Sequence, residues 1–162
     1  MKTQGTQFTG LCPECGAVIA YEVGQWIERG VLWWGSEGQC ERCAHGWCER
    51  DHGPVTPDRV RQALLTAHGP VRLGLADVPD KLVPLLRALR TTEDLTVAEA
   101  RARAGELSAT GLFGTLVERE YLALGLRDRG LAVVLERAVG STEPQGPDAA
   151  AAVQPLRNVA RG

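Results

Sequence analysis

Two pairs of cysteines constrain this chain more than any other feature of its sequence. Cys12 and Cys15 form the first pair, and Cys40 and Cys43 form the second. Two thiolates separated by two residues can bind one metal ion, and a second pair completes a tetrahedral set of four. The pattern therefore predicts a zinc ribbon in which these four side chains hold one structural zinc ion, Zn²⁺.

The residues between the two pairs favour a small antiparallel sheet. Residues 17–23 and 31–34 are rich in strand-forming side chains, and Gly30 and Gly35 bracket the second segment. A unit this small and this rich in glycine buries little apolar surface, so it needs a metal or disulfides for stability. We expect residues 1–54 to fold as the zinc ribbon.

Three further side chains lie near the second cysteine pair, namely His45, Cys48 and His52, and any of them could replace a cysteine as ligand. We interpret Cys48 as a small apolar residue at a strand end, and both histidines as turn residues. A catalytic zinc keeps an open coordination position, whereas four thiolates fill the tetrahedron. The predicted metal is therefore structural.

The tryptophans offer a candidate contact surface, because all four lie between positions 26 and 47. Trp33 and Trp34 are neighbours in a predicted strand, so their side chains point to opposite faces of the sheet. One then covers the thin core of the ribbon, and the other is exposed to a partner. Both are retained as candidate partner-binding residues.

The charge of the ribbon argues against a nucleic-acid partner. Residues 1–54 carry four basic and seven acidic side chains. Binding to a phosphate backbone depends mainly on Lys and Arg, and this segment has no basic footprint. We therefore expect another protein, rather than nucleic acid, as the partner.

A membrane partner is not expected either. Residues 1–10 are polar and do not resemble a signal peptide, and no apolar run approaches the ~20 residues that span a bilayer. The expected location is the cytoplasm. In a reducing cytosol, cysteines serve as metal ligands more often than as disulfides.

Residues 55–70 form a predicted linker helix. Thr56 has the character of an N-cap, and Pro57 suits the first helical position. Val60 and Leu64 then fall on one apolar face, and Gly69 ends the helix.

Residues 71–140 alternate strand and helix patterns in the order βααβαβ. Two capping boxes, Thr96 to Glu99 and Thr115 to Glu118, open the second and third helices. The fold class is therefore α+β: a zinc ribbon followed by a small α/β sandwich with its helices on one sheet face. Residues 141–162 have few large apolar side chains and are expected to be disordered.

The second unit resembles a known family over residues 71–137. The matching positions, which align without a gap between Asp80 and Arg101, are Arg87, Arg90, Leu95, Val97, Glu99, Ala100 and Arg101. This pattern is similar to that of the C-terminal domain of the bacterial ribosomal stalk protein. In that family the helical face recruits translational GTPases, so the resemblance implies that Arg87, Arg90 and Arg101 form a basic docking face. Two features depart from the family: Asp94-Leu95-Thr96 replaces its Gly-Leu-Gly turn, and the ribbon replaces its dimerisation segment.

The sequence contains no set of residues typical of an enzyme, such as a phosphate loop, a Ser/His/Asp set or a pair of catalytic carboxylates. The predicted function is that of a non-enzymatic, zinc-binding adaptor for protein interaction. Two alternatives remain. One is an immunity or antitoxin protein whose acidic ribbon covers a basic toxin. The other is a translation or transcription accessory factor that binds the ribosome, a GTPase factor or nucleic acid.

Overall fold

The computed structural model describes residues 2–80 and 82–138. The predicted disordered tail, residues 141–162, lies outside them. The first sheet contains β1 (Thr3–Leu11), β2 (Val18–Glu28), β3 (Val31–Gln39) and β4 (Gly46–His52). The remaining elements are α1 (Asp58–His68), β5 (Val71–Leu75), α2 (Leu82–Glu93), α3 (Val97–Ala109), β6 (Leu112–Gly114), α4 (Leu116–Arg127) and β7 (Val133–Arg137). The α+β fold class is confirmed.

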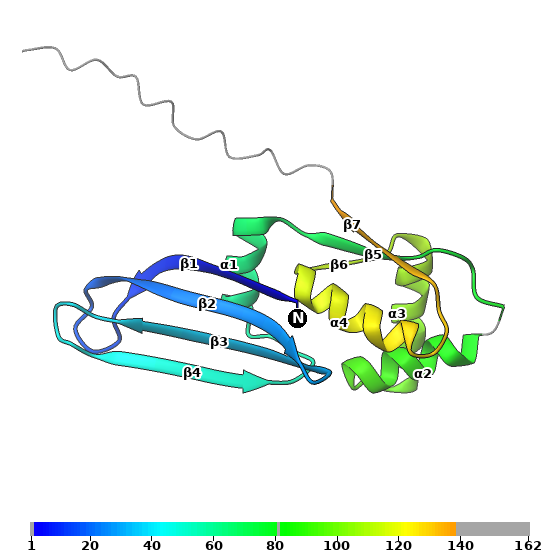
Figure 1. The fold of residues 1–162 in the computed structure, drawn as a ribbon, viewed down its shortest axis with the longest axis horizontal. Helices are drawn as coiled ribbons and strands as arrows, with labels where there is room; N and C mark the ends of the chain where they lie inside the picture. The colour runs from blue at the N-terminus through cyan, green and yellow to red at the C-terminus, as the bar shows by residue number, and fades with distance from the viewer. Residues whose placement is uncertain (1, 81, 139–162) are drawn as a thin grey trace, which may run out of the picture.

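The N-terminal unit is an antiparallel meander in the order β1-β2-β3-β4 (Figure 1). The predicted strands at residues 17–23 and 31–34 are present as β2 and β3, and both extend further than predicted. Arg29 and Gly30 join them in a tight turn with φ values of 52° and 75°. A two-residue turn with both central φ values positive matches the right-handed twist of the strands that it connects.

The first strand was not recognised in the sequence. β1 has the sequence TQGTQFTGL, which alternates in exposure but places mainly Thr, Gln and Gly on its two faces. An edge strand buries little, so the apolar alternation that identifies a half-buried strand is weak here. Its pairing with β2 over nine residue pairs places it at the edge of the sheet.

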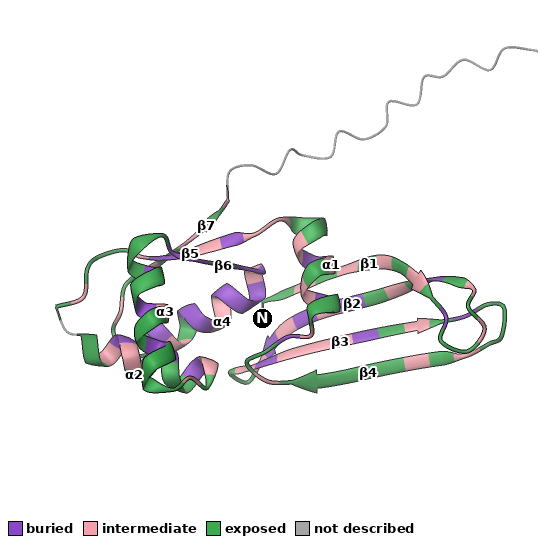
Figure 2. Ribbon diagram, turned by 180° about the vertical axis from the view of Figure 1, so that it is seen from behind, coloured by how far each residue is buried: buried purple, intermediate pink, exposed green. Residues whose placement is uncertain are grey.

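One face of this sheet, termed the inner face, packs against α1, and α4 meets it at the end away from the cysteine turns (Figure 2). Val23 of β2 packs with Val60 and Leu64 of α1. Further along the sheet, Ile27 and Leu32 pack against Val117 of α4. The two units are therefore joined through apolar contacts, and the linker helix is part of the ribbon's core.

The start of α1 differs from the prediction. The helix begins at Asp58, Pro57 occupies the N-cap, and no side chain caps the helix. Thr56 does not cap it, because its hydroxyl instead accepts a hydrogen bond from the side-chain amide of Gln25 in β2. A tertiary contact therefore outweighs the local capping preference at this position.

The second unit has the predicted order of elements. Its three antiparallel strands are arranged β6-β5-β7. The helices pack on one side of this sheet (Figure 1), and both predicted capping boxes, at Thr96 and Thr115, are formed. Leu73 of β5, Leu89 of α2, Leu107 of α3 and Leu122 of α4 meet in the core.

The turn between α2 and α3 contains a non-glycine residue with a positive φ. Asp94 adopts a φ of 54° directly after α2. The backbone N–H of Leu95 donates to the carbonyl of Arg90 at 3.2 Å, which closes the C-terminus of α2. Aspartate tolerates this left-handed conformation better than most residues, so the turn forms without a glycine.

Candidate metal centre and contact surfaces

The two cysteine pairs lie in equivalent turns at one end of the first sheet. Cys12 and Cys15 occupy the turn between β1 and β2, and Cys40 and Cys43 occupy the turn between β3 and β4. Cys12 donates its backbone N–H to Ala17 at 2.8 Å, and Cys40 donates to His45 at 2.8 Å. The antiparallel meander brings both turns to the same end of the sheet, so the two cysteine pairs face each other.

The two turns share one unusual backbone conformation. Gly16 follows the second cysteine of the first turn with a φ of 69°, and Ala44 holds the same place in the second turn with a φ of 58°. Glycine adopts this conformation without a steric penalty, whereas alanine has a Cβ that crowds the backbone.

The four sulfur atoms converge on one point. The Sγ atoms of Cys12 and Cys43 lie 3.7 Å apart, and those of Cys15 and Cys40 lie 3.6 Å apart. All four lie within 4.8 Å of one another. A tetrahedron with Zn–S bonds of ~2.3 Å has edges of about 3.8 Å, so the cluster has the dimensions that such an ion requires.

Two thiols of the cluster differ in pKa. The backbone N–H of Cys43 hydrogen-bonds the sulfur of Cys40 and, with smaller contributions from its neighbours, lowers the pKa of Cys40 to about 7. The N–H of His45 lowers the pKa of Cys43, but burial and the three other sulfurs outweigh it and raise that pKa to about 12. A metal ion must displace these protons, because only thiolates bind it.

The side chains around the cluster form a small apolar shell. Cys12 and Cys40 are buried with Ile19, and Tyr21 and Trp47 pack against them. The hydroxyl of Tyr21 donates to the carbonyl of Leu11 at 2.7 Å. The buried residues at this end of the sheet are therefore Ile19 and two of the cysteines, with two aromatic rings beside them.

The three additional candidate ligands lie outside this cluster. Within residues 2–80 and 82–138, the side chains whose ligand atoms converge are the four predicted cysteines. His45 stacks near Trp47, with ring centroids 6.2 Å apart. Cys48 is exposed in the middle of β4, and His52 lies at the far end of that strand, 4.7 Å from Trp33 between ring centroids.

The two adjacent tryptophans lie on opposite faces of the sheet. Trp34 packs on the inner face against the cluster of Val23, Val60 and Leu64. Trp33 lies on the opposite face, termed the outer face, where its ring stacks on Trp26 at 6.4 Å between centroids. The outer face therefore presents a pair of tryptophans, of which Trp26 was not singled out in the sequence.

The three candidate arginines are exposed on neighbouring helices. Arg87 and Arg90 lie one turn apart on α2, and Arg101 lies on α3. The Nε of Arg90 donates to the carbonyl of Leu95 at 3.2 Å, which restrains one of the three side chains.

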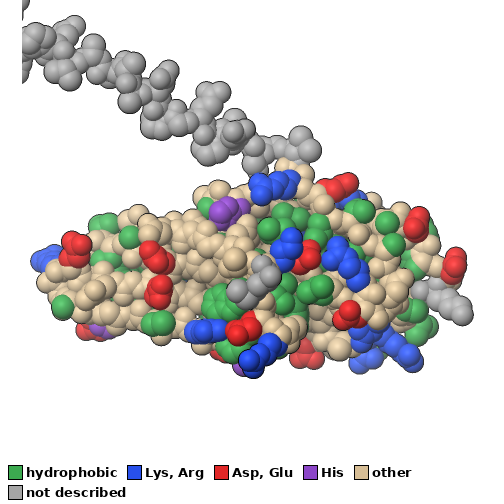
Figure 3. Space-filling view, viewed as in Figure 1, with side chains coloured by type: hydrophobic (Ala, Val, Ile, Leu, Met, Phe, Trp, Pro, Cys, Tyr) green, Lys and Arg blue, Asp and Glu red, His purple; other side chains and the backbone are tan. Residues whose placement is uncertain are grey.

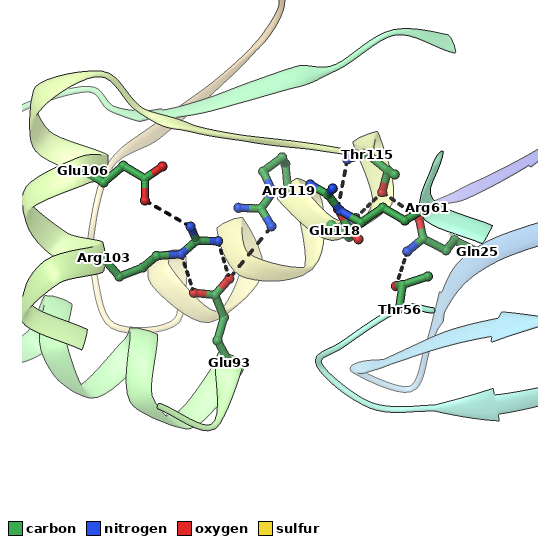
Figure 4. A network of polar contacts seen from close by, with 9 residues as sticks. All are labelled: Gln25, Thr56, Arg61, Glu93, Arg103, Glu106, Thr115, Glu118 and Arg119. Carbon is green, nitrogen blue, oxygen red and sulfur yellow. Dashed lines mark hydrogen bonds and ion pairs between the residues drawn. The ribbon is translucent and has the colours of Figure 1, made fainter. Parts of the chain in front are cut away.

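A polar network that the sequence did not reveal joins the two units (Figure 4). Gln25 is fully buried. Its amide nitrogen donates to Thr56, and its amide oxygen accepts from Thr115 at 2.6 Å. Glu118 accepts from Arg61 at 3.1 Å on the same side of α4. No local pattern marks Gln25 as functional, because its partners lie 31 and 90 residues away.

A cleft of about 620 Å³ opens beside this network. Arg119 is 5% exposed at its edge, and its guanidinium lies 3.8 Å from Glu93. Burial lowers the pKa of Arg119 against the attraction of Glu93 and Glu118. Burial also lowers the pKa of Arg103, but its hydrogen bonds to Glu93 outweigh the effect and raise it. Arg61 and Arg103 thus hydrogen-bond carboxylates of the chain itself. The buried Nε and Nη1 of Arg119 have no hydrogen-bond partner among residues 2–80 and 82–138.

Comparison with known proteins returned no matching family model, no matching curated protein and no matching solved structure. Across residues 2–80 and 82–138, no helix has the length and apolar character needed to cross a membrane.

Proposed function

We propose that this protein is a non-enzymatic protein-interaction module whose N-terminal sheet is held by one structural zinc ion. The convergence of four cysteine sulfurs within 4.8 Å carries the proposal. Four thiolates complete a tetrahedral shell and leave no position for a substrate or an activated water. The metal then stabilises the end of the sheet that has little apolar core. Its role is structural rather than catalytic.

The interaction role is supported by the uneven covering of the sheet. Helices α1 and α4 pack on part of its inner face, while Trp26 and Trp33 remain half-buried on the outer face, where no helix packs within residues 2–80 and 82–138. Aromatic side chains gathered on an uncovered surface are characteristic of protein contacts, because they bury a large area at a low entropic cost. Arg87, Arg90 and Arg101 provide a second proposed contact surface. Cysteines kept as metal ligands suit a reducing compartment such as the cytosol.

Native mass spectrometry of the untagged protein tests the metal. We expect one zinc ion per chain, and we expect it to be lost in Cys40→Ser. Cys48→Ser is the matched control, because Cys48 is a cysteine outside the cluster, and this variant should keep its zinc. A chain that carries no metal, or more than one ion, would refute the structural-zinc proposal.

Site-specific crosslinking tests the interaction. A photoreactive residue replaces Trp33 on the outer face, and the same residue replaces Thr66 on α1 as the control. Protein loaded with zinc should crosslink a discrete partner from position 33 and should not crosslink it from position 66. Equal crosslinking from positions 33 and 66, or none from position 33, would contradict the assignment of the outer face.

A further inference from the structure

Three glycines lie side by side across the outer face of the first sheet. Gly5 of β1 pairs with Gly24 of β2, which in turn pairs with Gly35 of β3. None of them adopts a positive φ. A Cβ added at Gly5 or Gly24 would meet only a backbone oxygen, at 3.4 Å and 3.5 Å respectively. Gly35 differs, because its Cβ would lie 2.8 Å from the carbonyl of Glu49 and 3.5 Å from the ring of Trp26.

Gly5 and Gly24 therefore lower the stability of the sheet, and no steric requirement within β1 and β2 explains them. Glycine in a strand interior lowers stability, because it loses more backbone entropy and packs no side chain. A strand glycine often marks a bulge, a tight bend, or a place where a ligand or another backbone approaches closely. The register across β1, β2 and β3 is continuous, so no bulge accounts for Gly5 or Gly24.

The glycines form the floor of a trough with two unlike walls. On one side, Trp26 and Trp33 pair in register and stack. On the other side, Glu22 and Glu37 pair in register. Gly24 and Gly35 line a shallow cavity of about 270 Å³, which Trp26, Glu37 and Arg50 also line. Figure 3 looks onto this face, where acidic and hydrophobic side chains over the β1–β4 sheet are separated by a strip coloured as backbone and other side chains.

The acidic wall carries charge that the chain leaves uncompensated. Like charges directly opposite each other on paired strands destabilise a sheet. The amide of Gln7 donates to Glu22 at 2.7 Å, and among residues 2–80 and 82–138 neither Glu22 nor Glu37 forms an ion pair. A cation placed between the two carboxylates would relieve this repulsion.

The aromatic wall already accommodates one guanidinium group. Arg50 is the register partner of Gly35 on β4, and its guanidinium carbon lies 4.7 Å from the ring centroid of Trp26 and 4.8 Å from that of Trp33. It also forms an ion pair with Glu28 at 2.9 Å. Stacking on indole combined with pairing to a carboxylate is the contact that arginine makes better than lysine.

We propose that this trough binds an arginine-bearing segment of a partner protein. The inference rests on the proposed function and specifies the chemistry of the partner. The segment lies across the glycine floor, its guanidinium pairs with Glu22 and Glu37, and its aliphatic stem contacts Trp26. The outer face carries Glu22, Glu28 and Glu37 against Arg50, so its charge attracts a basic segment and repels a phosphate backbone.

The test is a titration of the zinc-loaded full chain with short peptides, followed through its backbone amide NMR signals. The probe is a blocked pentapeptide, Gly-Arg-Gly-Arg-Gly. The comparison peptide replaces both arginines by citrulline, which keeps the shape and removes the charge. We expect saturable shifts of the amides of Gly5, Gly24 and Gly35 with the arginine peptide, and no saturation with the citrulline peptide.

Two pairs of variants assign the walls and the floor. Glu22→Gln with Glu37→Gln should weaken binding of the arginine peptide about tenfold, through the loss of both charges. Asp77→Asn with Asp128→Asn changes the net charge equally on the other unit and should leave binding unchanged. Gly24→Val should abolish binding by filling the trough. Ala20→Val adds a β-branched residue to the same face of β2 and should not affect it.

The outcomes separate this inference from the proposed function. The trough would be overturned as a site for arginine if the wild type bound both peptides with equal affinity. It would also be overturned if Gly24→Val bound the arginine peptide as tightly as the wild type does. Saturable binding of a short RNA at the same glycines, or self-association through them, would also overturn it. If the crosslink from position 33 still identifies a partner, the interaction module stands and only the arginine assignment fails. If both experiments fail, the outer face is not a contact surface.

Discussion

Ala44 stands where the other cysteine turn has glycine. Its φ of 58° is one that an L-residue adopts at a cost, whereas Gly16 holds the equivalent conformation at 69° without a Cβ. We therefore predict that Ala44→Gly stabilises the zinc-loaded protein by about 1 kcal/mol, and that Gly16→Ala destabilises it by a similar amount. Chemical denaturation monitored by tryptophan fluorescence measures both. A loss of stability in Ala44→Gly would show that the turn is not strained.

Glu99 gives a residue-scale prediction about pH. The hydroxyl and then the backbone N–H of Thr96 hydrogen-bond its carboxylate, which lowers the pKa of Glu99 from its ordinary 4.5. A carboxyl group with a lowered folded-state pKa contributes stability above its unfolded pKa and loses it as the pH falls through the folded value. We expect Glu99→Gln to be less stable than the wild type at neutral pH, and the difference to shrink below pH 4.5.

The comparison of wild type with variant at each pH removes effects common to both proteins. Acid also protonates the cysteines and releases a bound metal, but that loss occurs equally in Glu99→Gln. A stability difference that stayed constant from neutral to acidic pH would contradict the assigned role of the Glu99 charge.

At the scale of elements, the two capping boxes have the same local chemistry in different surroundings. Thr96 and Thr115 each accept a hydrogen bond from the N–H of the glutamate three residues later. Thr96 is exposed at the start of α3. Thr115 is fully buried at the start of α4, and its hydroxyl also donates to Gln25 of β2 at 2.6 Å.

This difference predicts unequal costs for the same substitution. Thr96→Val should destabilise the protein by about 1 kcal/mol through the loss of a cap. Thr115→Val should cost about 3 kcal/mol, since it also leaves the buried Gln25 oxygen without a donor. Urea unfolding of the two variants provides the comparison. Equal costs would mean that the Gln25 contact contributes nothing to the joining of the two units.

At the scale of the whole molecule, the cysteine cluster and the helices lie at opposite ends of the first sheet. The cysteine end has a core of Cys12, Ile19 and Cys40, with Tyr21 and Trp47 beside it. The other end is packed against α1 and α4. Removal of the metal should therefore loosen the cysteine end, while the helix-covered end and the second unit remain folded.

Hydrogen exchange before and after chelation measures this effect. We expect residues 9–20 and 38–48 to lose protection, while residues 24–34 and the core of the second unit keep it. Structural zinc contributes on the order of 10 kcal/mol in small zinc-binding peptides, so the change should be large. Uniform loss of protection across all strands and helices would show that the two units unfold as one.

Local chemistry was sufficient to predict some features from the sequence. The two-residue spacing within Cys12–Cys15 and within Cys40–Cys43 predicts that the two cysteines of each pair belong to one metal site. The capping boxes at Thr96 and Thr115 follow from a glutamate three residues later. Each of these signals acts within four residues of the chain, so the sequence alone specifies it.

Tertiary structure decided the features whose partners are distant in sequence. Thr56 has the residue type of a helix cap, but its hydroxyl instead accepts a hydrogen bond from the side chain of Gln25, which is buried and lies 31 residues away. β1 is a strand because β2 pairs with it, and Trp33 faces outward because helices cover the side of the sheet that Trp34 occupies. The alignment of Gly5, Gly24 and Gly35 exists only in the register of three strands. Strand pairing and face selection are set by long-range packing, which no local pattern specifies.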